Sequence, residues 1–155
     1  WVSIDSHLPN RLLLDAIQKQ RLAEFTIHED LQSEAVFGES RLDFSLQLNG
    51  KRGFIEVKSV TLVEDGVALF PDAPTLRGTR HVRELMTAMG RGYLAFLVFV
   101  IQRGDARAFS PHKARDLDFA QAVGEAVAAG VTVLAYDCEV TPTDVALRGP
   151  VPVIL

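Results

Sequence analysis

Hydrophobic and polar residues alternate along two neighbouring segments in the first half of the chain, residues 42–48 and 52–60. A period of two is typical of β-strands whose two faces meet different surroundings. The dipeptide Asn49-Gly50 joins the segments and favours a two-residue turn, because both residue types accept positive φ angles. The pattern therefore predicts an antiparallel β-hairpin.

Apolar residues at helical spacing predict three helices, over residues 9–22, 75–89 and 118–129. The second helix has a clear apolar stripe, formed by Val82, Leu85, Met86 and Met89. Asp118 is expected to cap the third helix.

Further strands are predicted for residues 1–5, 34–37, 67–70, 94–101 and 131–136. The segment 94–101 is continuously apolar, as expected of a central strand covered on both faces. The order of elements indicates an α/β fold with a mixed central sheet flanked by helices. The chain has 155 residues, a length that suits one domain.

Composition narrows the function classes only slightly. The formal net charge of −4 argues mildly against a free-standing nucleic-acid binder, which usually carries a basic surface. Cys138 is the one cysteine, so an intrachain disulfide and a zinc site of several thiolates are excluded, and a reducing cytoplasm is expected. The longest apolar run, 93–101, is about half the length that spans a bilayer. The first residue is Trp1 rather than Met, so we expect a piece of a longer protein.

The turn predicts the register of the hairpin. If Asn49 and Gly50 form the loop, Leu48 pairs with Lys51, and Asp43 lies opposite Glu56. Successive side chains then point to opposite faces. One face is predicted to be core and holds Leu42, Phe44, Leu46, Ile55 and Val57; the other holds Asp43, Ser45, Glu56 and Lys58.

Two carboxylates opposed across a hairpin repel each other, and a divalent cation would offset that repulsion. Mg²⁺ usually takes one or two protein carboxylates and completes its shell with water or phosphate. Lys58 could then orient a metal-bound water or stabilise charge on a phosphate. Asp43, Glu56 and Lys58 thus form the candidate site for metal-assisted phosphodiester hydrolysis. The alternative interpretation is an ordinary solvated hairpin face.

Three further acidic residues are candidates for an additional part of this site. Glu34 and Glu39 precede Asp43, and either or neither could supply a third ligand. Asp72 follows a strand and precedes a helix, so it is a turn or capping residue or else borders the metal site.

Basic residues near the second helix are candidates for phosphate contacts. Arg77 and Arg80 lie opposite the core stripe, where they form a solvated face or a row that contacts phosphates. Arg41, opposite Lys58 in the predicted register, has the same candidate role. His81 borders the apolar stripe and is expected to be a packed histidine.

Several motifs together resemble the sugar fermentation stimulation protein A family. They are Ser40-Arg41-Leu42-Asp43-Phe44, the run from Ile55 to Leu62, the run from Ala68 to Gly78 that contains Phe-Pro-Asp-Ala, and His81-Val82-Arg83-Glu84-Leu85. The match continues through Gln102-Arg103 and Phe109-Ser110-Pro111, and Leu8-Pro9-Asn10-Arg11 precedes it. The resemblance covers nearly the whole chain.

The resemblance implies an N-terminal OB-fold-like domain followed by a restriction-endonuclease-like domain of the PD-(D/E)XK type. Residues 1–155 match only the second domain, so the OB-fold-like domain is expected upstream. The family is described as DNA-binding and as linked to regulation of sugar, especially maltose, metabolism. The resemblance thus implies DNA as partner and Mg²⁺ or Mn²⁺ as cofactor, with Asp43 and Glu56 as metal ligands and Lys58 beside them.

Two functions from different classes follow. The first is a metal-dependent nuclease, whose activity Glu56→Ala would abolish. The second is a non-catalytic, non-specific DNA-binding regulator that keeps the nuclease fold, because a fold does not by itself imply an activity. Its DNA binding would depend on salt and would survive Glu56→Ala.

Overall fold

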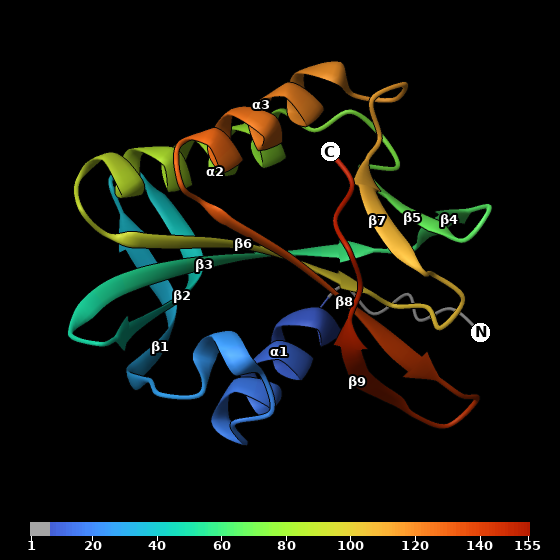
Figure 1. Cartoon of the computed structure of the whole chain (residues 1–155), viewed down its shortest axis with the longest axis horizontal. Helices are drawn as coiled ribbons and strands as arrows, with labels where there is room; N and C mark the ends of the chain where they lie inside the picture. Colours follow the sequence, from blue (N-terminus) through green and yellow to red (C-terminus); the bar gives the residue numbers. More distant parts are fainter. Residues whose placement is uncertain (1–6) are drawn as a thin grey trace.

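The computed structural model describes residues 7–155, so the strand predicted for residues 1–5 lies outside the described part. The centre is a six-stranded sheet with strand order β1-β2-β3-β6-β8-β9 (Figure 1). Its strands are β1 (Glu29–Phe37), β2 (Ser40–Leu48), β3 (Lys51–Val60), β6 (Leu94–Ile101), β8 (Thr132–Val140) and β9 (Val145–Pro150). The three central strands β3, β6 and β8 are parallel and their outer neighbours are antiparallel, so the predicted mixed sheet is confirmed.

Helices cover both faces of this sheet. Helix α1 (Leu8–Gln18) lies below it in Figure 1, and α2 (Leu76–Gly90) and α3 (Leu117–Ala128) lie above it. A second sheet at the side has the strand order β4-β5-β7, with β4 (Leu62–Glu64), β5 (Val67–Phe70) and β7 (Ala108–Pro111). Among the described residues, no helix is both long and apolar enough to cross a bilayer.

Each face of the central sheet has its own hydrophobic core. Leu85 of α2 and Phe119 of α3 pack on one face, and Leu13 and Ile17 of α1 pack on the other. Strand β6 contributes alternate residues to both cores, for example Leu97 to the first and Val98 to the second. Its near-complete burial explains why the sequence of this strand is continuously apolar.

The hairpin has the predicted register. Leu48 pairs with Lys51, and the ladder continues regularly to Phe44 paired with Ile55. The turn residue Asn49 has a φ of 51° and Gly50 a φ of 79°, as a type I′ turn requires.

The face predicted for Leu42 is wrong. Leu42 packs in the core beneath α2 and α3, whereas Phe44 packs in the core against α1. The reason is that the β2–β3 ladder ends at Phe44, and the carboxylate of Asp43 accepts the backbone N–H of Val57 at 2.7 Å instead. The regular alternation of β2 is therefore not kept at Asp43.

Other differences concern element ends and short strands. The first helix ends at Gln18 rather than at residue 22, and Gln20 has a φ of 56°. A short 3₁₀ helix, η1 (Ala23–Phe25), follows. Asp116, not Asp118, caps α3 by accepting the N–H of Phe119 at 3.0 Å. Strands β4, β7 and β9 were not predicted, since they are short or contain proline and carry little alternation.

Candidate functional site

Glu56 lies in the middle of β3 and points towards α2. Its side chain is only 4% exposed. Its Oε2 atom lies 2.9 Å from Nζ of Lys58, two residues along the same strand, and 2.5 Å from Nδ1 of His81 in α2. The strand and the helix therefore place one carboxylate between two nitrogen donors.

Asp43 is held against the end of the β2–β3 ladder by two hydrogen bonds. Its Oδ2 accepts the backbone N–H of Val57 at 2.7 Å, and its Oδ1 accepts from Nδ2 of Asn10 in α1 at 2.9 Å. Burial and then the charge of Glu56 act on the carboxyl group of Asp43 and raise its pKa, so the two acids interact. The structure thus brings Asp43, Glu56 and Lys58 together, although Asp43 and Glu56 lie just beyond the last paired residues of the ladder.

The pKa values of the two acids are shifted in opposite directions. Burial, followed by the charge of Glu56, raises the pKa of Asp43 to about 6. Burial also acts to raise the pKa of Glu56, but the bond from His81 and the charge of Lys58 outweigh it and hold that pKa at about 2. The pair therefore keeps Glu56 ionised, while Asp43 exchanges its proton near pH 6.

Two adjacent carboxylates fit a hard divalent cation that takes few protein ligands, as Mg²⁺ does. Within residues 7–155, no group of three or more His, Cys, Asp or Glu side chains is placed to hold a metal ion. A cation here would accordingly depend on water and substrate oxygens for most of its shell.

The three additional acidic candidates do not form a metal-binding group with this pair in the described structure. Glu34 lies beside Asp43 in the β1–β2 register, between the pairs Ser33–Phe44 and Ala35–Leu42, but its side chain is exposed. Glu39 is exposed in the turn between β1 and β2. Asp72 is exposed after β5, and the capping residue of α2 is Thr75 instead.

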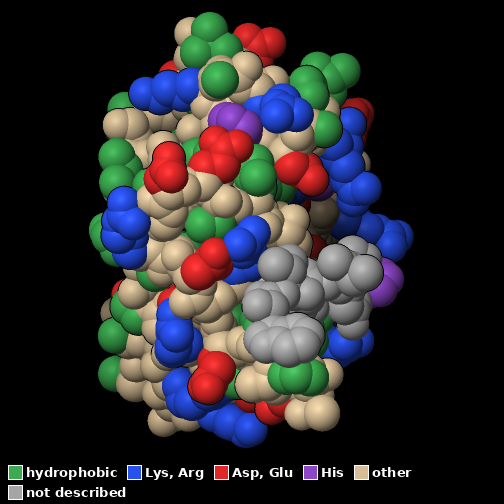
Figure 2. All heavy atoms as spheres, turned by 90° about the vertical axis from the view of Figure 1, so that its right-hand side faces the viewer, with side chains coloured by type: hydrophobic (Ala, Val, Ile, Leu, Met, Phe, Trp, Pro, Cys, Tyr) green, Lys and Arg blue, Asp and Glu red, His purple; other side chains and the backbone are tan. Residues whose placement is uncertain are grey.

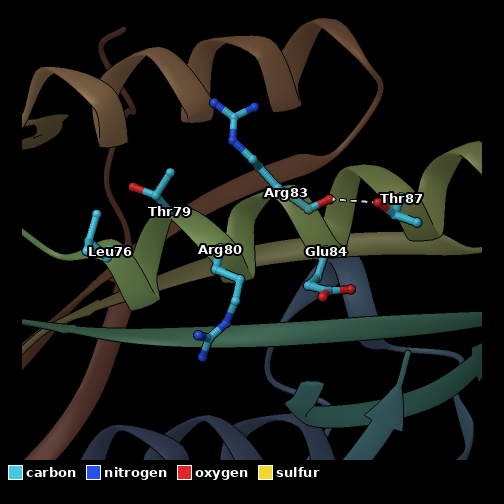
Figure 3. A pocket seen from close by; sticks show the side chains of 6 residues that line it. All are labelled: Leu76, Thr79, Arg80, Arg83, Glu84 and Thr87. Carbon is cyan, nitrogen blue, oxygen red and sulfur yellow. Dashed lines mark hydrogen bonds between the residues drawn. The ribbon is translucent and has the colours of Figure 1, made fainter. Parts of the chain in front are cut away.

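The candidate phosphate-binding arginines are all exposed: Arg41 on β2, and Arg77 and Arg80 at the start of α2. Arg80 and Glu84 extend to one side of α2 and Arg83 to the other, around a surface pocket of about 350 Å³ (Figure 3). Glu84 accepts from Ser40 of β2 at 3.2 Å, and Arg83 pairs with Glu125 of α3 at 3.1 Å. Arg80 thus leaves the helix on the side that faces β2.

Charges of both signs are interspersed over most of the face that Figure 2 shows, and several Lys or Arg side chains lie side by side along its upper right edge. This distribution agrees with the small net negative charge of the chain.

Asn10 and His81 are the site residues that the sequence analysis missed. Asn10 belongs to one of the motifs that resemble the family, and its distance from Asp43 along the sequence gave no indication of contact. His81 was expected to be a packed histidine, and it is indeed buried. Its proximity to Glu56 could have been found only by knowing that α2 packs on the face of β3 that carries Glu56.

The chain was compared with known proteins. The protein-family model described as "Sugar fermentation stimulation protein RE domain" matches residues 7–144. A sugar fermentation stimulation protein homolog from Desulforamulus reducens is 46% identical over 154 residues, which are 99% of this chain and 64% of that protein. A homolog of the same name from Moorella thermoacetica is 49% identical and covers all of this chain and 67% of that protein.

A solved structure supports the same relationship. The structure of Pyrococcus furiosus SfsA in complex with Ca²⁺ superposes with a TM-score of 0.94 at 31% sequence identity. It covers 99% of this chain and 67% of the Pyrococcus furiosus chain. This chain therefore spans about two thirds of the length of its relatives, and it belongs to the sugar fermentation stimulation protein family.

Proposed function

We propose that this chain carries a PD-(D/E)XK-type site for Mg²⁺- or Mn²⁺-dependent hydrolysis of DNA phosphodiesters. The observation that carries the proposal is the pair of half-buried Asp43 and buried Glu56, with Lys58 bonded to Glu56 at 2.9 Å. Acid, acid and lysine on one hairpin beside parallel strands are the arrangement that the restriction-endonuclease-like fold would require.

In this proposal each side chain has a distinct role. Asp43 and Glu56 would hold the cation, which supplies Lewis acidity and a water of lowered pKa when it is bound. Asn10 and the N–H of Val57 orient Asp43. Lys58 would stabilise negative charge that develops on the phosphate.

The related Pyrococcus furiosus protein was solved with Ca²⁺, a hard cation that prefers oxygen ligands. That finding supports a divalent cation as the partner of the two carboxylates. The words "RE domain" in the family description agree with a restriction-endonuclease-like core.

DNA is proposed as the substrate because exposed arginines lie near the site. Arg41 on β2 and Arg77 and Arg80 on α2 are exposed and could contact backbone phosphates. Phosphate contacts position the nucleic acid without reading its sequence, so we expect cleavage of low sequence specificity.

A second candidate is a non-catalytic DNA-binding regulator of sugar metabolism. One observation favours it: only two acidic side chains meet at the site, and no third acid, histidine or cysteine among residues 7–155 completes a metal-binding group. Glu34, which the register places beside Asp43, is the acid to test as an additional contributor.

The deciding experiment is cleavage of labelled single- and double-stranded DNA with Mg²⁺ or Mn²⁺. It compares the wild type, Glu56→Ala and Glu56→Gln, with EDTA and the exposed acid variant Glu64→Ala as controls. Melting temperatures confirm that each variant is folded. Metal-dependent cutting that is lost in both Glu56 variants and kept in Glu64→Ala is expected.

Salt-sensitive DNA binding without cutting, equal in the wild type and the Glu56 variants, would replace the nuclease proposal with the regulatory one. Glu34→Gln in the same assay reports whether a third carboxylate assists. A loss comparable to that of Glu56→Gln would assign Glu34 to the site.

A further inference from the structure

Three polar atoms from two elements converge in the interior beside the proposed metal site. Oε2 of Glu56 lies 2.9 Å from Nζ of Lys58 and 2.5 Å from Nδ1 of His81, and the two nitrogens are 3.0 Å apart. The exposed fractions of these side chains are 4% for Glu56, 12% for Lys58 and 5% for His81. Water has little access to this cluster, so its geometry depends on the three side chains themselves.

The part of α2 that carries His81 is held in place by a cap and by close packing. The helix is capped by Thr75, whose hydroxyl accepts the N–H of Gly78 at 2.9 Å. A β-carbon on Gly78 would lie 2.7 Å from the Thr75 side chain and 3.4 Å from Phe119 of α3. The first turn is therefore tightly packed, and the neighbouring Val82 is fully buried in the core. Packing of α2 thus fixes where the imidazole meets β3.

The direction of the hydrogen bond follows from the acceptor. A carboxylate oxygen only accepts, so the contact with Glu56 at 2.5 Å requires a proton on Nδ1 of His81, as Nζ of Lys58 also donates to Glu56. With that proton in place, the 3.0 Å approach of Nζ to Nδ1 is a contact and not a hydrogen bond. Both donors use Oε2. The carboxylate is held through that oxygen, and neither of these two donors uses Oε1.

We propose that His81 is a positioning residue of the site: it orients Glu56, and through the shared oxygen Lys58, for cation binding and hydrolysis. The inference rests on the proposed function and adds a role for a residue on α2. Removing a hydrogen-bond donor that orients a metal-binding carboxylate typically lowers metal affinity or activity by about 10- to 100-fold.

The competing explanation is a buried histidine that contributes only to packing. Two substitutions separate the explanations. His81→Asn keeps an amide nitrogen near the position of Nδ1, whereas His81→Gln moves its donor towards the position of Nε2. Both remove the ring, so a packing role predicts similar effects of the two variants.

The experiment measures Mn²⁺ affinity by titration calorimetry and kcat and KM for DNA cleavage in the wild type and both variants. His28→Gln is the matched control, because the ring of His28 bonds to the backbone carbonyl of Phe25 at 2.8 Å and lies outside the site. Melting temperatures monitor folding. We expect His81→Gln to lose about 10-fold or more in Mn²⁺ affinity and kcat, with KM little changed. His81→Asn should keep most of both, and His28→Gln should match the wild type.

Equal Mn²⁺ affinity and kcat in the wild type and His81→Gln would overturn this inference and leave the proposed nuclease intact. Equal losses in His81→Asn and His81→Gln that follow their melting temperatures would also overturn it, in favour of packing. A wild-type protein that neither binds Mn²⁺ nor cuts DNA would refute the proposed function, and the positioning role of His81 with it.

Discussion

Two buried acids on the central sheet have contrasting surroundings. Asp137 on β8 is 5% exposed, and Arg148 of β9 donates to its Oδ2 from both Nε and Nη2. The N–H of Gly149 completes this arrangement at 3.2 Å, and Arg148 also donates to the carbonyl of Gly104 at 3.0 Å. Glu56 on β3 is just as buried, but a second acid, Asp43, lies against it.

The difference separates a structural ion pair from the proposed metal site. At Asp137 one guanidinium matches one carboxylate, so the charge is balanced and the donors are used within the protein. At Glu56 the added carboxylate of Asp43 makes the local charge more negative, and the pKa of Asp43 rises to about 6 through burial and the charge of Glu56. Binding a cation would relieve this repulsion, and no such gain exists at Asp137.

The sharpest test of this contrast applies the same substitution to both regions. Asp43→Asn removes a negative charge from the proposed metal site, and we expect DNA cleavage to fall by at least about 100-fold. Asp137→Asn should leave cleavage within about two-fold of the wild type, because this acid serves only the β8–β9 pair. Single-turnover cleavage rates at saturating Mg²⁺ provide the measurement. Equal losses in the two variants would break the comparison.

The structural role of the Asp137–Arg148 pair is tested by Arg148→Met. This substitution leaves Asp137 buried without its guanidinium partner. Breaking a fully buried pair costs about 3–5 kcal/mol. Arg148 is 49% exposed, so we expect the free energy of unfolding to fall by about 2 kcal/mol. Urea denaturation measures it, and Arg83→Met, from a pair exposed on both sides, is the control with a loss below about 1 kcal/mol. A loss no larger than that of the control would show that the Asp137 pair is not structural.

The raised pKa of Asp43 predicts that metal binding at this site depends on pH. Below about pH 6 the cation must displace a proton from Asp43, so Mn²⁺ affinity should fall by up to about ten-fold per pH unit and level off above pH 6. Titration calorimetry between pH 5 and 8 measures this change.

Metal-free stability should change in the opposite direction. The folded pKa of Asp43 lies above its ordinary value of 3.8, so this contribution to stability is complete below pH 3.8 and is lost as the pH rises through about 6. Asp43→Asn should lack the trend. A wild type that gains stability relative to this variant between pH 5 and 7 would contradict the assignment.

The smallest expected effect concerns DNA contact near the site. Arg80 lies on the side of α2 that faces β2, whereas Arg83 is occupied by Glu125. We expect Arg80→Ala to weaken DNA binding by about five-fold and to lower the salt slope by about 1, with Arg83→Ala close to the wild type. Fluorescence anisotropy over a salt series measures both quantities. Equal effects of the two variants would place the DNA elsewhere.

The register of the hairpin could be predicted from the sequence, because it depends on residues that are close along the chain. Asn49-Gly50 selects one turn geometry, and that turn determines which residues of β2 and β3 pair. The face of the sheet on which Leu42 packs was predicted wrongly. The strand leaves the ladder at Asp43, because the Asp43 carboxylate accepts a hydrogen bond from the backbone of Val57. No local pattern encodes a bond between a side chain and a neighbouring strand.

What the sequence by itself determined is the hairpin and the register of its two strands from the turn to the pair Phe44–Ile55, which leaves Asp43 and Glu56 just beyond the end of the ladder. These depend on contacts close along the chain, where turn geometry and alternation leave few choices. Only the tertiary structure decided that Asn10 from α1 and His81 from α2 would contact those acids. The position of a helix on a sheet depends on how all the side chains of the core pack together. The sequence of the helix alone does not indicate which strand lies beneath each of its residues.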